Sequence, residues 1–420
     1  MMKFKEYWKI LGPGLTTGAA DDDPSGITTY SQVGAQRGFG LAWMALFSLP
    51  LLGVVQEMSA RIGLVTGVGL AENIKRHYSK KVLYTCTLLL LVANIFNIGA
   101  NLGAMAEGAK LLFPQLYFPF LVAGFAFLSL VLQVFVTYKN YSKYLKYLAL
   151  VLFAYVFSAL SIDMNWGEIF KHTIIPMINF SKEELLLVCA VLGTTISPYL
   201  FFWQSSQEVE EDILRGEDTE EKRRTMTTAQ DISNMRVDVW SGMIISNIVM
   251  FFIIIACAAT IFNGGGVTIN SAAEAASALR PFAGNAAFIL FALGILGTGM
   301  LSIPVLAGSA SYAVSESFGW KEGLNMKLKQ ATSFYGVIAL AMVLGIVLNF
   351  VGFDPIKMLI YSAVLNGIIS PIILFLIVRI SGKEDVMGKH TNSVMSKILG
   401  WLAVGIMSVV SILAIVFLVI

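Results

Sequence analysis

The sequence predicts an all-α protein that crosses a membrane many times, and three observations support this fold class. Of the 420 residues, 56% are hydrophobic and only 13% carry a charge. The apolar residues gather in eleven stretches of roughly 20 residues, the length of helix that spans a bilayer. Lysine and arginine concentrate in alternate connections between these stretches. A lipid bilayer is therefore an expected partner, and nothing in the composition indicates a nucleic-acid partner.

Charged, glycine-containing or proline-containing segments bound each apolar stretch and so delimit the predicted spans. The spans lie at 10–36, 41–62, 82–111, 117–137, 144–161, 184–208, 237–262, 284–315, 330–350, 355–378 and 397–419. The first and sixth are predicted to be broken, because each contains an internal proline among polar residues. A short helix is expected at 272–279, in the connection between spans 7 and 8.

The basic residues also predict the orientation of the chain. With the N-terminus inside the cell, 23 of the 29 lysine and arginine residues fall in cytoplasmic segments and 6 in outer segments. One span more or fewer would spoil this asymmetry, which is the usual sign of topology in membrane proteins. We therefore expect a multi-pass protein of the cell membrane with a cytoplasmic N-terminus and an extracellular C-terminus.

Three consecutive acids, Asp21, Asp22 and Asp23, lie inside the first span, followed by Pro24. A charge at the bilayer centre costs roughly 2.5–3.5 kcal/mol, so an acid at this depth indicates a functional site. The proline also removes a backbone donor and pushes the preceding residue out of the helical region. The triplet at a helix break therefore predicts a cation site.

A second break is predicted in span 6, where 193–199 reads Gly-Thr-Thr-Ile-Ser-Pro-Tyr. Paired interruptions in corresponding helices indicate the substrate site of a transporter built from inverted repeats. Spans 1 and 6 correspond if the chain is two inverted five-helix repeats plus an eleventh span. The expected boundaries are 1–165 for the first repeat, 166–380 for the second and 381–420 for the last span.

The polar residues near the two breaks supply hard oxygen donors. Besides Asp21, Asp22 and Asp23, the candidate donors are Ser25, Thr28, Thr194, Thr195, Ser197, Asn366 in span 10, and freed backbone carbonyls. The three cysteines lie in apolar segments and the three histidines in predicted loops. A site made of oxygen alone suits Mg²⁺, Mn²⁺ or Ca²⁺ better than Fe²⁺, Zn²⁺ or copper.

Other polar residues inside the spans have two interpretations. Asn94, Asn97 and Asn101 share one face of span 3 and either line a pathway or bond to neighbouring helices. Trp203 and Gln204 follow the second break, and Gln207 and Glu208 lie one turn further along the helix. This stripe either lines an inner vestibule or has a structural role alone.

The two broken segments resemble the NRAMP family of divalent metal transporters. The family's first signature runs from Gly-Pro-Gly to Asp-Pro-Gly-Asn, and here Gly-Pro-Gly at 12–14 lies the same distance before Asp-Pro-Ser-Gly at 23–26, without a gap. The second signature, Gly-Ala-Thr-Val-Met-Pro-His, matches residues 193–199. The resemblance covers essentially the whole chain and implies the LeuT-type fold with alternating access. It also implies that the Asp23 carboxylate and the Thr194 carbonyl bind the metal.

The sequence departs from the family at several site positions. Gly26 replaces the ligand asparagine, Ser197 replaces the methionine that favours transition metals, and Tyr199 replaces a histidine thought to assist proton movement. In span 3, Asn101 and Ala104 align with acids of the family. This pattern resembles the divergent NRAMP-related magnesium transporter branch. That branch is implied to carry Mg²⁺ and Mn²⁺ as substrates, without a cofactor and without strong proton coupling.

Three other functions compete with this interpretation. A proton-coupled Mn²⁺ or Fe²⁺ transporter would keep the family's usual chemistry. An amino-acid transporter of the same fold is disfavoured because the three aspartates would repel a substrate carboxylate. An aspartyl intramembrane enzyme needs a carboxylate from a second segment, and the span 6 break has none. We therefore do not expect an enzyme.

Overall fold

The structure, a computed structural model, describes residues 4–263, 269, 271–352 and 355–419. These residues form helices joined by short connections, and none of them lies in a β-strand. Nine of the described helices are long and apolar enough to cross a membrane. A shorter apolar helix and the broken first segment bring the described chain to the predicted eleven spans. The prediction of an all-α polytopic architecture is therefore confirmed.

The helices follow the predicted spans closely. In chain order they are α1 (Phe4–Ile10), α2 (Pro13–Asp21), α3 (Pro24–Arg37), α4 (Trp43–Thr66), α5 (Leu70–His77), α6 (Lys80–Leu112), α7 (Phe118–Phe135), α8 (Tyr138–Leu148), α9 (Phe153–Leu160), α10 (Trp166–Ile174), α11 (Lys182–Thr195), α12 (Pro198–Leu214), α13 (Glu220–Met226), α14 (Ala229–Cys257), α15 (Ala272–Phe318), α16 (Thr332–Leu348), α17 (Pro355–Ser381), α18 (Glu384–Met387) and α19 (Val394–Val419).

Two of the spans deviate from a regular α-helix. Span 5 consists of α8 and α9, which a 3₁₀ turn at Ala149–Leu152 connects, and it begins six residues before the predicted boundary of 144. The predicted short helix at 272–279 forms the start of α15. A backbone break at Gly284, where φ is +76°, separates it from span 8. Glycine adopts this left-handed conformation without the steric cost that a Cβ would add.

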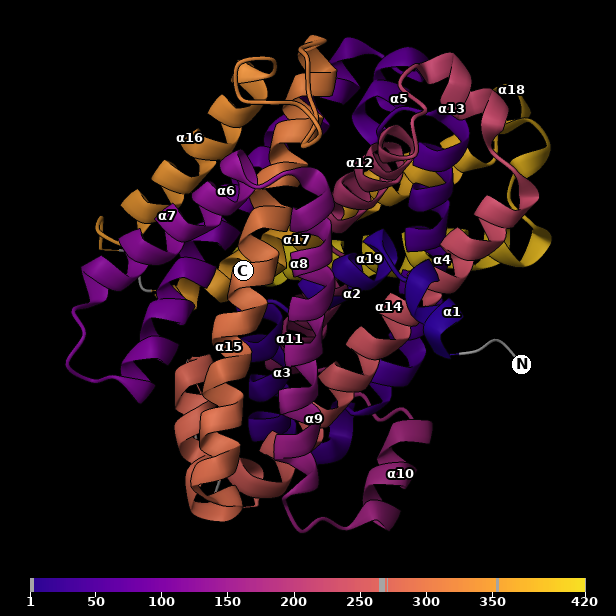
Figure 1. The fold of residues 1–420 in the computed structure, drawn as a ribbon. Coiled ribbons are helices and arrows are strands. Elements are labelled where there is room, and N and C mark those ends of the chain that lie inside the picture. Colours follow the sequence, from indigo (N-terminus) through magenta and orange to yellow (C-terminus); the bar gives the residue numbers. More distant parts are fainter. Residues whose placement is uncertain (1–3, 264–268, 270, 353–354, 420) are drawn as a thin grey trace.

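Short surface helices mark the two ends of the bundle. Figure 1 shows α5 and α13 together at one end, at the top of the view, and α10 at the other end. α5 connects spans 2 and 3 and α13 connects spans 6 and 7, whereas α10 connects spans 5 and 6. Connections that follow even-numbered spans therefore lie at one end of the bundle, and the connection after span 5 lies at the other, as expected when each span crosses the membrane.

Glycines bring α2 and α14 into close contact and so fix the first half of the broken span. A Cβ atom built on Gly18 would lie 2.3 Å from the backbone of Gly242, and one built on Gly14 would lie 2.5 Å from Val239 N. Small residues at a helix crossing let two backbones approach closely, which supports helix association inside a membrane. The position of the first break therefore depends on glycine in α2.

Candidate metal centre

Both predicted breaks are present, and each begins its second half with proline. α2 ends at Asp21 and α3 begins at Pro24, while α11 ends at Thr195 and α12 begins at Pro198. Proline suits the first position of a helix because that position needs no backbone donor. The chain between the half-helices is fully buried in each case, so protein covers the unwound backbone, as a membrane interior requires.

Two contacts join the two breaks, and a glycine allows their close approach. The Tyr199 hydroxyl donates to the Ala20 carbonyl at 2.9 Å, so a residue of the second break satisfies a carbonyl that the first break frees. The hydroxyls of Tyr30 and Thr195 lie 3.1 Å apart. A Cβ built on Gly26 would lie 3.0 Å from the Asp21 carbonyl oxygen and 3.5 Å from Thr194 Oγ1. The predicted site segments of spans 1 and 6 are thus neighbours.

Asp23 is the most fully hydrogen-bonded acid of the triplet. Its Oδ1 accepts from the Gly26 backbone N–H at 2.7 Å, so the carboxylate caps the first turn of α3. Its Oδ2 accepts from the side-chain amides of Asn97 and Asn101, each at 3.0 Å. Three donors therefore fix the orientation of the carboxylate, and the remaining lone pairs of its oxygens are available to a cation.

The asparagine face of α6 bonds across helices. Asn97 also accepts from Ser362 of α17 at 3.2 Å, and Asn101 also donates to Ser302 of α15 at 3.3 Å. Asn94 donates to Leu306 and Ser309 of α15, away from Asp23. All three asparagines therefore form hydrogen bonds between helices, which is one of the two interpretations that the sequence left open. For Asn97 and Asn101 one of the partners is the Asp23 carboxylate.

Asp21 and Asp22 are buried but have few partners. Oδ2 of Asp21 accepts from the Ser246 hydroxyl of α14 at 2.7 Å, and its Oδ1 has no hydrogen-bond partner. Both carboxylate oxygens of Asp22 are buried without a partner. Across the described residues, no lysine or arginine forms an ion pair with any acid of the triplet. The triplet therefore concentrates acidic groups in a buried place without a basic neighbour to compensate them.

The second break frees backbone carbonyls at the end of α11. The Ser197 hydroxyl lies 2.7 Å from the carbonyl oxygens of both Gly193 and Thr194 and donates a shared hydrogen bond to them. The end of a helix leaves such carbonyls without intrahelical partners. A carbonyl oxygen has two lone pairs, so the Thr194 carbonyl keeps one for a further partner.

Asn366 lies beside the second break, on α17. Its neighbour Ser370 donates to the Ile196 carbonyl at 2.6 Å and to the Asn366 carbonyl at 2.7 Å. The Asn366 side chain is buried, and its Oδ1 has no hydrogen-bond partner. The helix that carries Asn366 thus contacts the second break, and no hydrogen bond connects the Asn366 side chain to the aspartates.

The three aspartates do not converge. Within the described ranges, no group of three or more His, Cys, Asp or Glu side chains is arranged to hold a metal ion. Asp21 reaches α14 and Asp23 reaches α6, because consecutive residues at a helix end point in different directions. A metal ion at this place would therefore need backbone carbonyls, amide oxygens or water beside a single carboxylate.

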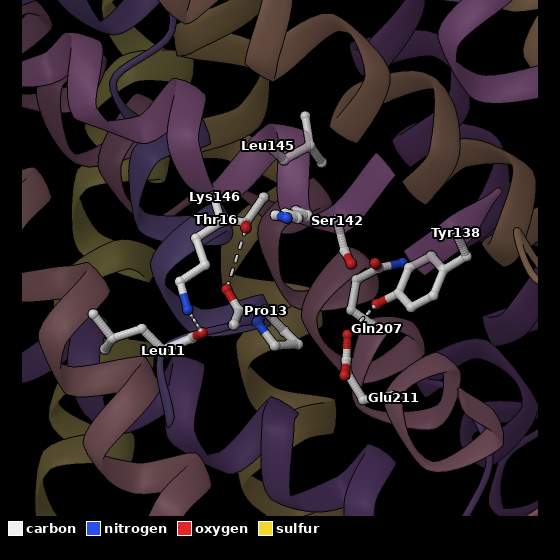
Figure 2. A pocket seen from close by; sticks show the side chains of 11 residues that line it. Leu11, Pro13, Thr16, Tyr138, Ser142, Leu145, Lys146, Gln207 and Glu211 are labelled. Atoms are coloured by element: carbon white, nitrogen blue, oxygen red, sulfur yellow. Dashed lines mark hydrogen bonds between the residues drawn. The ribbon is translucent and has the colours of Figure 1, made fainter. Parts of the chain in front are cut away.

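A cavity of about 230 Å³ lies beside the start of α2, between α8 and α12. Figure 2 shows Gln207 and Glu211 of α12 facing Tyr138, and Lys146 reaching the Leu11 carbonyl. Gln207 is a predicted vestibule residue, and its Nε2 is buried without a partner. Glu208, another residue of the predicted stripe, lines a neighbouring cavity rather than this one and accepts from Gln204.

Asp238 of α14 is a structural residue that the sequence did not indicate. Its carboxylate accepts from the backbone N–H groups of Gly12, Gly14 and Leu15 at 2.7–3.0 Å. A carboxylate beside a helix N-terminus satisfies free donors and complements the helix dipole. Asp238 therefore holds the first half of the broken span, although more than 220 residues separate it from the start of that helix.

We expect the substitution Asp238→Ala to lower stability by roughly 2–4 kcal/mol, because buried backbone donors would lose their acceptor. The melting temperature of the purified protein in detergent checks this. Asp238→Asn keeps one acceptor oxygen and should fall between the alanine variant and the wild type. Asp163→Ala, at an exposed position, is the control. If Asp238→Ala had the same melting temperature as this control, the capping role of Asp238 would be contradicted.

Comparison with known proteins agrees with this architecture. The family described as natural resistance-associated macrophage protein-like, Nramp, matches residues 14–417. The chain belongs to the Nramp family. A divalent metal cation transporter MntH of Clostridium acetobutylicum is 24% identical over 410 residues, which are 95% of this chain and 88% of that relative. An MntH of Caldanaerobacter subterraneus is 25% identical over 406 residues, covering 95% and 90% respectively.

Solved structures show the same fold. The manganese transporter of Eremococcus coleocola, an Nramp-like structure, superposes with a TM-score of 0.74 at 18% identity and covers 97% of this chain and 86% of its own. Mhp1, a transporter of the nucleobase-cation-symport-1 family, gives a TM-score of 0.59 at 14% identity and covers 97% and 90%. The predicted LeuT-type fold is confirmed, and this Nramp protein is a member of a family of divalent metal transporters.

Proposed function

We propose that this Nramp protein is a secondary transporter that carries Mg²⁺, and also Mn²⁺, by alternating access. The observation that carries the proposal is the buried acidic triplet, which has no basic partner among the described residues. Burying an ionised carboxylate costs several kcal/mol unless an opposite charge accompanies it. A divalent cation supplies that charge.

The proposed ligands come from both breaks. The Asp23 carboxylate binds the ion, and the Thr194 carbonyl supplies a neutral oxygen from the opposite side. Asp21 and Asp22 provide negative charge and accept hydrogen bonds from water around the ion, since three of their four oxygens have no partner. Ser197, Gly26 and Asn366 border the site, and the small Gly26 leaves room for water.

The preference for Mg²⁺ follows from the chemistry of these groups. Carboxylate, carbonyl, hydroxyl and amide groups surround the breaks, and such hard donors suit Mg²⁺ and Mn²⁺. Mg²⁺ gives up its water reluctantly and usually keeps several molecules. One carboxylate with a few neutral oxygens fits such an ion. The Eremococcus coleocola protein, which is named as a manganese transporter, supports Mn²⁺ as a second substrate.

The proposed transport cycle uses two inverted repeats, 1–165 and 166–380, followed by span 11 in 381–420. The N-terminus lies in the cytoplasm and the C-terminus outside the cell membrane. Under this orientation the cavity beside Gln207 and Glu211 opens toward the cytoplasm and receives the ion after it leaves the site. Transport is passive or weakly coupled to protons, because Asn101, Ala104 and Tyr199 stand at positions where the family has titratable groups.

Proteoliposomes containing the purified protein test this proposal. An inward Mg²⁺ gradient should drive uptake of Mg²⁺ into these vesicles, Mn²⁺ should compete, and an internal pH dye should report little acidification. Acidification that follows metal uptake would instead support the proton-coupled Mn²⁺ alternative. Absence of both Mg²⁺ and Mn²⁺ uptake in vesicles that contain folded protein would contradict the proposal.

A further inference from the structure

A groove at the end of the bundle that carries α13 lies outside the candidate metal centre. It has a volume of about 660 Å³ and lies between the end of α7, the start of α8, the end of α12 and the connection before α16. We call it the lysine groove. Its lining residues are Val134, Phe135, Val136, Thr137, Tyr138, Lys139, Leu214, Leu324, Asn325, Met326, Lys327, Leu328, Lys329, Gln330 and Tyr335.

One wall of the lysine groove is apolar and open to the surroundings. Phe135, the last residue of α7, is 75% exposed, and Leu214 and Leu328 are each 41% exposed. α7 is one of the membrane-spanning helices and the least buried of them. This wall therefore lies where the end of a span meets the surface of the bilayer, and acyl chains can reach it.

The lining also carries basic side chains, two of which flank Leu328 in the sequence. Lys139, Lys327 and Lys329 are exposed, and their ammonium groups form no hydrogen bond or ion pair with any residue that the structure describes. No aspartate or glutamate lines the groove. The groove thus combines an apolar wall with three uncompensated positive charges, an arrangement that complements the acyl chain and phosphate of an anionic lipid.

The connection that carries two of these lysines is held in place. Glu210 of α12 accepts from the backbone N–H groups of Leu324 and Asn325 at 2.7 and 3.1 Å. The Tyr335 hydroxyl donates to the Met326 carbonyl at 2.7 Å. These bonds fix the backbone next to Lys327. The groove is therefore already formed before a ligand binds, and binding loses less conformational entropy than it would in a mobile loop.

We propose that the lysine groove binds one anionic phospholipid of the cytoplasmic leaflet. The phosphate lies among Lys139, Lys327 and Lys329, and an acyl chain follows Phe135 and Leu328. Basic pockets between membrane helices on the cytoplasmic side are suited to such headgroups. The inference uses the orientation proposed above but does not depend on which ion is transported.

Native mass spectrometry of the full-length protein in detergent tests this site. The probes are dioleoyl phosphatidylglycerol and dioleoyl phosphatidylcholine at equal concentrations. The site variant is Lys139→Gln/Lys327→Gln/Lys329→Gln. The matched control is Lys81→Gln/Lys389→Gln/Lys397→Gln, which removes the same charge from exposed lysines outside the groove. Leu328→Gln keeps the charges and removes part of the apolar wall.

We expect the wild type and the control to retain one phosphatidylglycerol and to prefer it over phosphatidylcholine. The site variant should bind phosphatidylglycerol at least about tenfold more weakly, since each lysine near an anionic membrane surface contributes about 1 kcal/mol to the binding free energy. Leu328→Gln should also weaken retention. Equal loss in the site and control variants would overturn the proposal, as would equal retention of both lipids. Displacement of the lipid by inorganic phosphate at millimolar concentration would also overturn it, because the groove would then be a site for free phosphate.

Discussion

Asp23→Asn should reduce Mg²⁺ uptake into proteoliposomes by roughly 100-fold, which corresponds to about 2.7 kcal/mol of lost binding to the ion. The side chain keeps its shape and one acceptor oxygen, so the cap on Gly26 can persist. What changes is the charge, together with an amide donor that now faces the donors of Asn97 and Asn101. Initial uptake rates at matched protein density give the result.

The control for this experiment is Asp163→Asn, which removes an exposed carboxylate far along the chain from both breaks. It should transport at the wild-type rate. Melting curves of both variants show whether loss of uptake reflects loss of fold. Uptake by folded Asp23→Asn at the wild-type rate would exclude the Asp23 carboxylate as the binding group.

Gly18→Val should prevent accumulation of folded protein. A side chain at this position would enter the backbone of Gly242, since even a Cβ would approach it to 2.3 Å. Backbone cannot move aside as a flexible side chain does, so α2 and α14 would have to separate. We expect a cost of about 3 kcal/mol or more, visible as aggregation in size-exclusion chromatography.

A glycine with free space around it provides the matched control. Gly124 lies within α7, and a Cβ built there would meet no atom within 4 Å. Gly124→Val should therefore yield a monodisperse protein similar to the wild type. If Gly18→Val behaved in the same way, the close approach of α2 and α14 would not be needed for folding.

The number of spans and the places of the two breaks could be predicted because they are local properties. A span is a run of apolar residues, and a break is a proline among polar residues, so both are present in short windows of sequence. The bounds of span 5 were less accurate, because the amphipathic start of α8 (Tyr138–Leu148) has few apolar residues. Such a segment has no clear edge in a hydropathy pattern.

The contacts that complete the candidate site could not be predicted, because they join distant parts of the chain. Asn97 and Asn101 were known to share a helix face, but which helix meets that face depends on packing. Ser246 and Asp238 lie in α14 without any motif that would indicate their partners in α2 and at its break. The divergence of the three aspartates likewise depends on how α2 ends and α3 begins.

The location of the bound ion tests the central proposal most directly. Crystals of the protein grown with Mn²⁺ would reveal the ion by its anomalous scattering. The account predicts one strong peak between the two breaks. Metal–oxygen distances of about 2.0–2.6 Å are expected if the ion binds Asp23 and the Thr194 carbonyl directly. If the ion keeps its water, a water molecule should lie between the ion and each of these oxygens, and the distances should be correspondingly longer. A peak confined to the cavities beside Gln207 and Glu208, with none near Asp23, would contradict the account.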